Sequence, residues 1–420
     1  MKIYNRYNTE IKPNKAQERL LLKACGVARL VYNWGLARRI EEYKATGKQS
    51  NAISQNKQLN ALKKAEFPWM YEISKCAPQE ALRDLDKAYD GFFRRVKNGE
   101  KPGFPKFKAK HRTTQSFRIN YKCKVTDTRL NIPNVGLIRI KEHGYIPKCA
   151  SRYDKSSGQK YITIKRSGGG RWFVSVLVEE EVTESKKSEA QPVGVDLGLT
   201  TFAVNSDGER IKAPKFLRKK ERKLKKLQKA ASRKVKGSSN RKKAVKKLAV
   251  QHYKVACCRR NFLHQESSKL VKTKPVLVFE DLNINGMIKN HKLAKSISDA
   301  GWGGFVRMCT YKAERVGGRV IKADRWFASS KTCSRCRCKK DELNLDTRIF
   351  KCDSCGLEID RDLNAAINLK NWAIKNYVPP DRRESTPAQV NEGSKRVRGR
   401  KFRKRLTDDA SRSPELLVGV

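Results

Sequence analysis

The stretch PVGVDLGL, residues 192–199, places an aspartate, Asp196, within a short apolar run. The valines and leucines of this run fall on alternate positions, the period of a β-strand, so Asp196 shares a strand face with Gly194. An unpaired charge at the end of a buried strand is costly, so this carboxylate needs a partner. The fold and the chemistry expected of the chain both depend on what that partner is.

The composition is that of a large and strongly basic protein. The chain has 420 residues, with 95 Lys and Arg against 42 Asp and Glu, which gives a formal net charge of +53. Such a charge opposes compaction unless a polyanion neutralises it, and nucleic acid is the expected partner. A membrane surface is the rival, but the sequence has neither an apolar stretch long enough to span a bilayer nor a signal-peptide core. A cytoplasmic location in a prokaryotic cell is therefore expected.

The first part of the chain combines helical and strand patterns. Apolar spacing predicts one helix over residues 15–45 and a second from Pro78, followed by a basic loop with interspersed aromatic residues. Short alternating runs over residues 115–180, separated by turn residues, predict a small antiparallel sheet or barrel. The charged segment that follows reads as a linker over residues 183–190.

Strands and helices alternate after this linker. A hairpin follows Asp196, and then a long basic run with the single acid Glu221 predicts two helices interrupted at KGSSN. A solvated charged face is the ordinary meaning of such a run, but the near absence of acids favours contact with a phosphate backbone. The apolar run PVLVFEDLN then predicts a buried parallel strand that ends at Glu280, and a helix and a further strand follow it.

Four cysteines have the spacing of a zinc site. Two CxxC pairs are separated by residues 337–351, and four thiolates at this spacing predict a closed, structural zinc site rather than a catalytic one. Cys338 is expected to be a free thiol, and other cysteines are expected to be reduced thiols in hydrophobic cores. The expected ligands are Cys333, Cys336, Cys352 and Cys355, and the core thiols include Cys25, Cys76, Cys257 and Cys258.

Two more carboxylates, Asp360 and Asp362, precede a predicted helix directly after the second CxxC pair. A helix N-cap is the ordinary role of such aspartates, and exposure beside a lysine is the ordinary explanation for Asp196 and Glu280. Taken together, carboxylates from two strand ends and one helix start would repel one another unless divalent cations lay between them. We therefore expect two Mg²⁺ or Mn²⁺ ions, which suit oxygen ligands and phosphodiester hydrolysis.

The order of these motifs resembles a RuvC-type RNase H-like nuclease domain interrupted by a zinc ribbon. More specifically, the chain resembles the TnpB family of transposon-encoded RNA-guided DNA nucleases, which are related to the type V CRISPR effectors. One departure is Arg337, where the family usually has glycine after the first CxxC pair. The matching stretches are VYNWGLA, EALRDLDKAYDGFF, GEKPGFPKFK, GVDLGLTTFAV, FEDLNINGM, SSKTCSRC and CDSCGLEIDRDLNAAINL.

The resemblance implies a multidomain α+β fold. A wedge-like β-barrel would be built from residues 1–14 and 113–182, with a helical recognition domain inserted at residues 15–112. A RuvC-like α/β nuclease domain would comprise residues 191–328 and 357–378, with the zinc ribbon inserted at 329–356. Residues 379–420 would form a disordered basic tail.

The resemblance also implies a function and its residues. Asp196, Glu280 and Asp362 would be the catalytic carboxylates, with Asp362 preferred to Asp360. The protein would be a monomeric ribonucleoprotein that carries a guide RNA from the transposon end and cuts double-stranded DNA beside a short motif. The expected nucleic-acid contacts are Lys75 and Gln79, which would read the motif, and Lys106, Arg218, Lys219 and Arg222.

Two other functions remain open from the sequence. The zinc ribbon and the basic helices could belong to a non-catalytic regulator of transposition that only binds nucleic acid. Clustered carboxylates would also serve a transposase that joins DNA strands.

Overall fold

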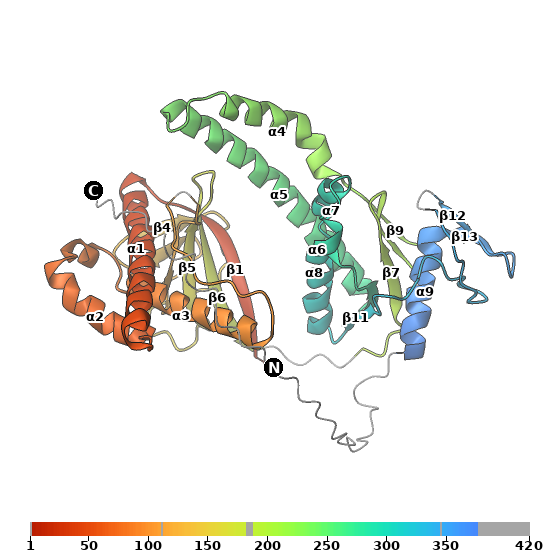
Figure 1. The fold of residues 1–420 in the computed structure, drawn as a ribbon, viewed down its shortest axis with the longest axis horizontal. Coiled ribbons are helices and arrows are strands. Elements are labelled where there is room, and N and C mark those ends of the chain that lie inside the picture. Colours follow the sequence, from red (N-terminus) through yellow and green to blue (C-terminus); the bar gives the residue numbers. More distant parts are fainter. Residues whose placement is uncertain (1, 111, 182–187, 345–346, 377–420) are drawn as a thin grey trace, which may run out of the picture. The chain divides into compact units, whose positions relative to one another are not determined.

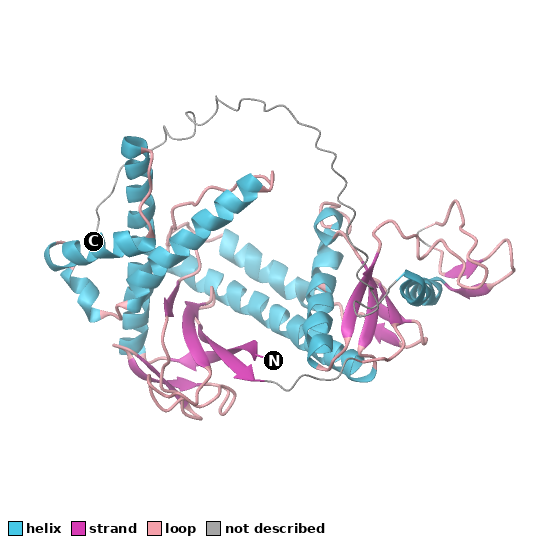
Figure 2. Cartoon of the chain, turned by 90° about the horizontal axis from the view of Figure 1, so that it is seen from below, coloured by secondary structure: helices cyan, strands magenta, loops and turns pink. Residues whose placement is uncertain are grey.

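The computed structural model describes residues 2–110, 112–181, 188–344 and 347–376 (Figure 1). The expected tail, residues 379–420, lies outside the described residues, and so does most of the expected linker. The described chain contains two large sheets, one of six strands and one of five, together with a small two-stranded hairpin (Figure 2).

The six-stranded sheet belongs to the N-terminal half of the chain. Its order is β2-β5-β6-β1-β4-β3, and β1 pairs antiparallel with β6 from Lys2↔Glu181 to Ile11↔Trp172. The first strand therefore joins the sheet formed by residues 116–181, as the sequence predicted. The strands are β1 (Lys2–Lys12), β2 (Ser116–Ile119), β3 (Arg129–Ile132), β4 (Gly136–Ile140), β5 (Gln159–Arg166) and β6 (Trp172–Glu181).

Two details of this sheet differ from the expectation. In the described ladder, β2 and β3 are the two ends of the strand order and do not pair with each other, so the expected barrel is an open sheet here. Strand β3 was not predicted, because only Leu130 and Ile132 of its four residues are buried and apolar. Two buried side chains give too short an alternation to distinguish a strand from a loop.

Helices occupy the region between β1 and β2. Helix α1 begins with a capping box formed by Asn14 and Gln17 and ends at Gly47, whose φ of 69° is left-handed. The sequence missed α2 because its buried residues include the polar Gln55 and Lys63, which interrupt an apolar stripe. The elements are α1 (Lys15–Thr46), α2 (Ala52–Ala65), the short 3₁₀ helix η1 (Pro68–Glu72) and α3 (Cys76–Lys97).

The five-stranded sheet lies in the C-terminal half, with the order β11-β10-β7-β8-β9. Strand β10 is parallel to both β7 and β11, whereas β8 and β9 continue antiparallel from β7 as the predicted hairpin. All of β10 except its last residue is buried, which matches its unbroken apolar sequence. The strands are β7 (Val193–Leu197), β8 (Thr201–Asn205), β9 (Arg210–Lys212), β10 (Val276–Glu280) and β11 (Arg319–Ala323).

Six helices and one hairpin complete the described part of the C-terminal half. The basic run forms two helices with a break between them, as predicted, and the short α6 and α7 were not predicted. The elements are α4 (Phe216–Ser232), α5 (Ser239–Thr273), α6 (Ile284–Met287), α7 (Ala294–Ala300), α8 (Trp302–Arg315), α9 (Arg361–Asn376), β12 (Ile349–Lys351) and β13 (Glu358–Asp360).

Each sheet has its own hydrophobic core. In the C-terminal core, Phe202 and Phe279 both contact Phe305 edge to face. The expected core thiols divide into two groups: Cys25 and Cys76 are buried, whereas Cys258 is exposed and Cys257 is only half-buried. The expectation was wrong for Cys258 because most side chains of α5 face solvent. In the described part of the chain, no helix has the length and apolar character needed to cross a membrane.

Candidate metal centres

Asp196 and Glu280 lie at the same edge of the five-stranded sheet. Strands β7 and β10 are parallel, and their last paired residues are Val195 and Phe279. The next residue on each strand is therefore a carboxylate, and both carboxylates project from the carboxyl ends of neighbouring strands. Both residues are half-buried.

Helix α9 brings the third carboxylate to this edge. A Cβ atom at Gly194 would lie 1.9 Å from the Ala366 carbonyl oxygen, so the helix backbone can contact β7 only because residue 194 is glycine. Asp196 is two residues further along the same face of the strand. Asp362 is one helical turn before Ala366, on the same face of the helix. The close contact at Gly194 therefore directs Asp362 towards Asp196.

The three carboxylates interact electrostatically. Burial, followed by the negative charges of Glu280 and Asp362, raises the pKa of Asp196 from 3.8 to about 8, against the opposing effect of Arg361. Three carboxylates that interact in this way could hold Mg²⁺ or Mn²⁺ through oxygen atoms. Among the described residues, the oxygens of the three carboxylates do not all lie within 4.8 Å of one another, as the four cysteine sulfurs do.

Asp360 has a different role from Asp362. One of its carboxylate oxygens accepts hydrogen bonds from the backbone N–H groups of Asp362 and Leu363, at 3.1 and 3.0 Å, and so caps the start of α9. The other oxygen lies 3.0 Å from an Arg210 guanidinium nitrogen. The N-cap alternative is therefore right for Asp360, while Asp362 faces the other two carboxylates.

Ser329, which was not predicted from the sequence, is in contact with this group of carboxylates. Its hydroxyl donates a hydrogen bond to Glu280, and the residue is buried. Two buried asparagines of α9, Asn364 and Asn368, hold the same segment through its backbone carbonyls. One sequence feature could have indicated these asparagine contacts: two Asn residues stand four positions apart on an otherwise apolar helix face. Buried amides need hydrogen-bond partners, so such a pair predicts contacts to another segment.

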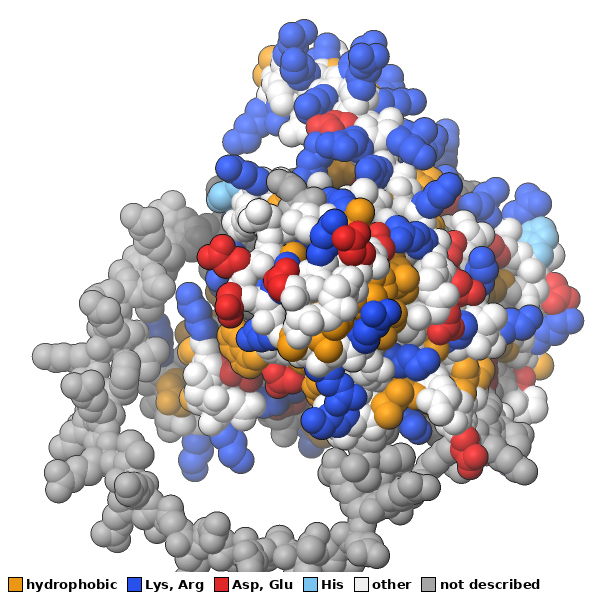
Figure 3. Space-filling view, turned by 90° about the vertical axis from the view of Figure 1, so that its right-hand side faces the viewer, with side chains coloured by type: hydrophobic (Ala, Val, Ile, Leu, Met, Phe, Trp, Pro, Cys, Tyr) orange, Lys and Arg blue, Asp and Glu red, His pale blue; other side chains and the backbone are white. Residues whose placement is uncertain are grey.

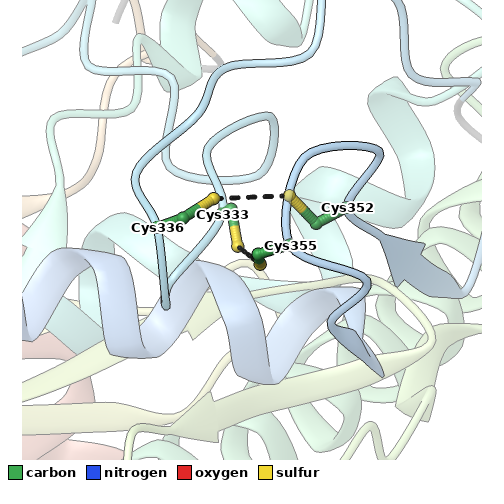
Figure 4. Close-up of side chains that lie close together, drawn as sticks. All are labelled: Cys333, Cys336, Cys352 and Cys355. Carbon is green, nitrogen blue, oxygen red and sulfur yellow. Dashed lines mark hydrogen bonds between the residues drawn. The ribbon is translucent and has the colours of Figure 1, made fainter.

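The four predicted zinc ligands come together. Their sulfur atoms all lie within 4.8 Å of one another, and two sulfur pairs are separated by 3.5 and 3.6 Å (Figure 4). Four thiols from two knuckles match the tetrahedral Cys₄ donor set of structural zinc sites. Backbone N–H groups of Cys355 and Ser354, together with the Cys336 and Cys333 thiols, lower the pKa of Cys352 to about 6, while partial burial and hydrogen bonds to the other three cysteines raise the pKa of Cys355 to about 12. The first thiolate of the cluster therefore forms readily at Cys352. The cluster can therefore hold zinc, and Cys338 lies outside it as an exposed thiol.

The two cysteine knuckles have the same backbone geometry. In each, the N–H of the first cysteine donates to a carbonyl five residues later at 2.9 Å, and its own carbonyl accepts from the residue four later at 3.0 Å. That residue four later is Arg337 in the first knuckle and Gly356 in the second, with φ values of 66° and 69°. Arg337 thus adopts the left-handed conformation that glycine normally supplies, and the knuckle forms despite the substitution.

The expected nucleic-acid contacts are exposed, except for Gln79. Lys75 precedes the first turn of α3 and is exposed, whereas Gln79 within that turn is half-buried. Basic side chains crowd the upper end of the view in Figure 3, where Figure 1 draws α4 and α5. The exposed candidates are Lys106 in the basic loop and Arg218, Lys219 and Arg222 on α4.

Three family models match the chain. They are described as "Probable transposase" over residues 175–291, "Cas12f1-like, TNB domain" over residues 302–369 and "Helix-turn-helix domain" over residues 1–48. The first range includes Asp196 and Glu280, and the second includes the cysteine cluster and Asp362. In the third, the described residues form one strand and one helix, β1 and α1.

Full-length relatives decide the family. A protein of Streptomyces pristinaespiralis named "Putative RNA-guided DNA endonuclease" is 34% identical over 359 residues, which cover 85% of this chain and 86% of the relative. The chain belongs to the TnpB family. A second TnpB relative, "Putative RNA-guided DNA endonuclease InsQ" of Escherichia coli K12, is 29% identical over 387 residues, which cover 88% of this chain and 92% of the relative.

The TnpB chain shares its fold with a solved CRISPR effector. A cryo-EM structure of a Cas12f1-sgRNA-target DNA complex aligns with a TM-score of 0.51 at 17% sequence identity. The alignment covers 85% of this chain and 82% of the Cas12f1 chain. At this identity the likeness concerns the fold, and the chemistry has to be argued from the carboxylates and cysteines themselves.

Proposed function

We propose that this TnpB-family chain is an RNA-guided endonuclease that cuts double-stranded DNA by metal-dependent hydrolysis in a RuvC-type site. The observation that carries the proposal is the convergence of Asp196, Glu280 and Asp362 at one edge of the five-stranded sheet. The names of the TnpB relatives support the guided-nuclease activity.

The three carboxylates would hold two Mg²⁺ or Mn²⁺ ions, since hard cations prefer oxygen ligands. When bound, the ions would activate a water molecule and stabilise the leaving oxygen of the phosphodiester. Asp196 gives up its proton when a cation binds, because proton and cation compete for the same oxygens. Ser329 donates a hydrogen bond to the carboxylate of Glu280 and so orients it.

The remaining parts of the chain would bind the nucleic acids. The guide RNA would come from the transposon end, and a monomer would hold it together with the target DNA. Lys75 and Gln79 would read the adjacent motif, while Lys106 and the exposed basic residues of α4 would contact phosphates. The formal charge of +53 supports this assignment, because phosphate contacts supply most of the salt-sensitive affinity for nucleic acid.

The expected domains map onto the described elements. The six-stranded sheet would be the wedge domain and helices α1 to α3 the recognition domain. The five-stranded sheet with α9 would be the RuvC-like nuclease domain, and residues 329–356 would form its zinc ribbon.

The test compares two adjacent acidic residues. Purified protein with its co-purified RNA is incubated with Mg²⁺ and DNA that matches the RNA, as wild type, Glu280→Gln and Asp281→Asn. The Asp281 carboxylate is 2.6 Å from Arg325 and 3.0 Å from Lys322, so it serves as the control. We expect Glu280→Gln to abolish cutting and Asp281→Asn to retain it.

Three results would count against the proposal. Cutting by Glu280→Gln at the wild-type rate would remove the catalytic assignment. Binding without cutting by the wild type would favour a regulator of transposition, and strand-joined products would favour a transposase. Sequencing the co-purified RNA tests the guided step, because a discrete transcript from the transposon end is expected.

A further inference from the structure

Ser329 is the hydrogen-bond partner of the Glu280 carboxylate. In the described part of the chain, the Ser329 hydroxyl is the one donor that Glu280 contacts. The serine is 1% exposed, so water cannot readily replace it. A glutamate has three rotatable side-chain bonds, and a buried donor at its tip selects one of the possible orientations.

Two asparagines on one face of α9 bind the backbone at this serine and three residues after it. The Asn368 side-chain amide donates to the Ser329 carbonyl at 2.8 Å and to the Thr332 carbonyl at 2.6 Å. The Asn364 amide donates to the same Thr332 carbonyl at 2.7 Å. We call Asn364 and Asn368 the asparagine clamp. Both are buried, so their loss would leave carbonyl oxygens without partners away from water.

The clamped segment leads directly into the cysteine cluster. Cys333 follows Thr332, and the backbone N–H of the next residue, Ser334, donates to the side-chain amide oxygen (Oδ1) of Asn364 at 2.9 Å. Asn364 therefore binds the backbone on both sides of one zinc ligand. Zinc bound at Cys333 would restrain the segment from one end, while the asparagine clamp restrains it along its length.

The same helix that carries Asp362 thus also holds the residue that contacts Glu280. We propose that Ser329 is a positioning residue for Glu280, and that the asparagine clamp and the zinc cluster together keep Ser329 in place. The cysteine site would then do more than stabilise a ribbon: its occupancy would set the geometry of the carboxylate metal site. The inference rests on the proposed function, because Glu280 is a metal ligand there.

The first test measures Mn²⁺ affinity by electron paramagnetic resonance on zinc-loaded, full-length protein freed of RNA. Asp196→Ala defines the binding that belongs to the carboxylates. Ser329→Ala is compared with Ser330→Ala, because Ser330 is half-buried and makes no described hydrogen bond. Partners that orient metal ligands contribute about tenfold or more to metal affinity, so we expect about tenfold weaker Mn²⁺ binding for Ser329→Ala alone.

The second test asks whether zinc acts through Ser329. Zinc is removed with a chelator from the wild type and from Ser329→Ala, and circular dichroism checks that the overall helix content does not change. Zinc removal is expected to weaken Mn²⁺ binding of the wild type by about tenfold, and to add little in Ser329→Ala, because coupled effects are not additive. If zinc removal and Ser329→Ala act independently, zinc removal will weaken Mn²⁺ binding by about tenfold in the variant as well. That result would overturn the proposed link between zinc occupancy and Ser329.

A third measurement does not require zinc removal. Asn368→Ala is expected to weaken Mn²⁺ binding and to speed zinc release to a chromogenic chelator, whereas the half-buried Asn371→Ala on the same helix should do neither. Equal zinc release from the two variants would overturn the role of the asparagine clamp.

The outcomes separate this inference from the proposed function. Unchanged Mn²⁺ binding in Asp196→Ala would remove the carboxylate metal site itself, and the inference would fall with it. Loss of binding in Asp196→Ala, with equal affinities for Ser329→Ala and Ser330→Ala, would overturn only the positioning of Glu280 by Ser329.

Discussion

The carboxylate of Asp196 is expected to make the Mg²⁺-free protein less stable as the pH rises. Its pKa is raised from 3.8 to about 8 in the folded protein, first by burial and then by Glu280 and Asp362. Between these two values the folded protein keeps a proton that the unfolded chain releases. The stabilisation from this proton is therefore complete below the unfolded-state pKa and is lost as the pH rises towards 8.

The size of the effect follows from this difference in pKa. One extra proton in the folded state lowers the free energy of unfolding by about 1.4 kcal/mol for each pH unit. From pH 5 to pH 7, where the difference is fully expressed, the loss amounts to roughly 2.5 kcal/mol. For a domain of roughly 150 to 250 residues, this loss of stability corresponds to a fall in Tm of about 5 to 10 °C.

The assay compares wild type with Asp196→Asn by urea unfolding at pH 5, 6 and 7, with zinc present and Mg²⁺ absent. The uncharged amide has no proton to lose, so the stability of the variant relative to wild type should grow by about 2.5 kcal/mol across this range. Asp341→Asn, at an exposed position, is the control and should follow the wild type. With saturating Mg²⁺, the free energy of unfolding of the wild type should vary less with pH, because a bound cation replaces the proton on Asp196.

If the free energy of unfolding changes with pH by the same amount in the wild type and in Asp196→Asn, this reasoning is refuted. That result would mean that Asp196 is ionised in the Mg²⁺-free fold, with its charge already compensated.

Three more outcomes follow from the described contacts. Gly194→Ala should destabilise the five-stranded sheet by about 3 kcal/mol or more, because the added Cβ atom would overlap the backbone of α9. The free energy of urea unfolding measures this loss. The control Gly91→Ala should show no such loss, because the added Cβ atom would lie in open space. Arg337→Gly should stabilise the zinc-loaded protein by about 1 kcal/mol, measured as a rise in Tm, because the left-handed φ of 66° costs glycine nothing. Trp326 follows β11 and is 86% exposed, so it should stack on an unpaired base. Trp326→Ala should therefore weaken the binding of single-stranded DNA by about tenfold, measured by fluorescence anisotropy, and should leave Tm unchanged.

The sequence predicted the parts of the site that depend on local pattern. Strand alternation placed Asp196 near a strand end, an unbroken apolar run placed Glu280 at another, and the CxxC spacing identified all four cysteines. The choice between Asp360 and Asp362 came from the family motif, and the structure gives its physical basis: one carboxylate caps α9 while the other faces Asp196.

The contacts that support these groups could not be predicted. Ser329 and Glu280 are 49 positions apart, and a serine before a cysteine knuckle has no pattern that identifies its partner. Helix α2 escaped prediction for a related reason: its buried Gln55 binds the Gly35 carbonyl and the Arg39 guanidinium, so polar pairing replaces the apolar stripe. Tertiary hydrogen bonds of this kind leave no periodic trace in the sequence.

The pairing of β1 with β6 has a consequence for synthesis on the ribosome. Strand β1 is synthesised well before its partner, residues 172–181, which emerges only after some 170 further residues. At a synthesis rate of roughly 5 to 20 residues per second, about 10 to 35 seconds pass before the backbone N–H and C=O groups of β1 can pair with β6. Its mixture of charged and polar side chains, KIYNRYNTEIK, suits that interval, because an edge with few large apolar groups is slow to aggregate.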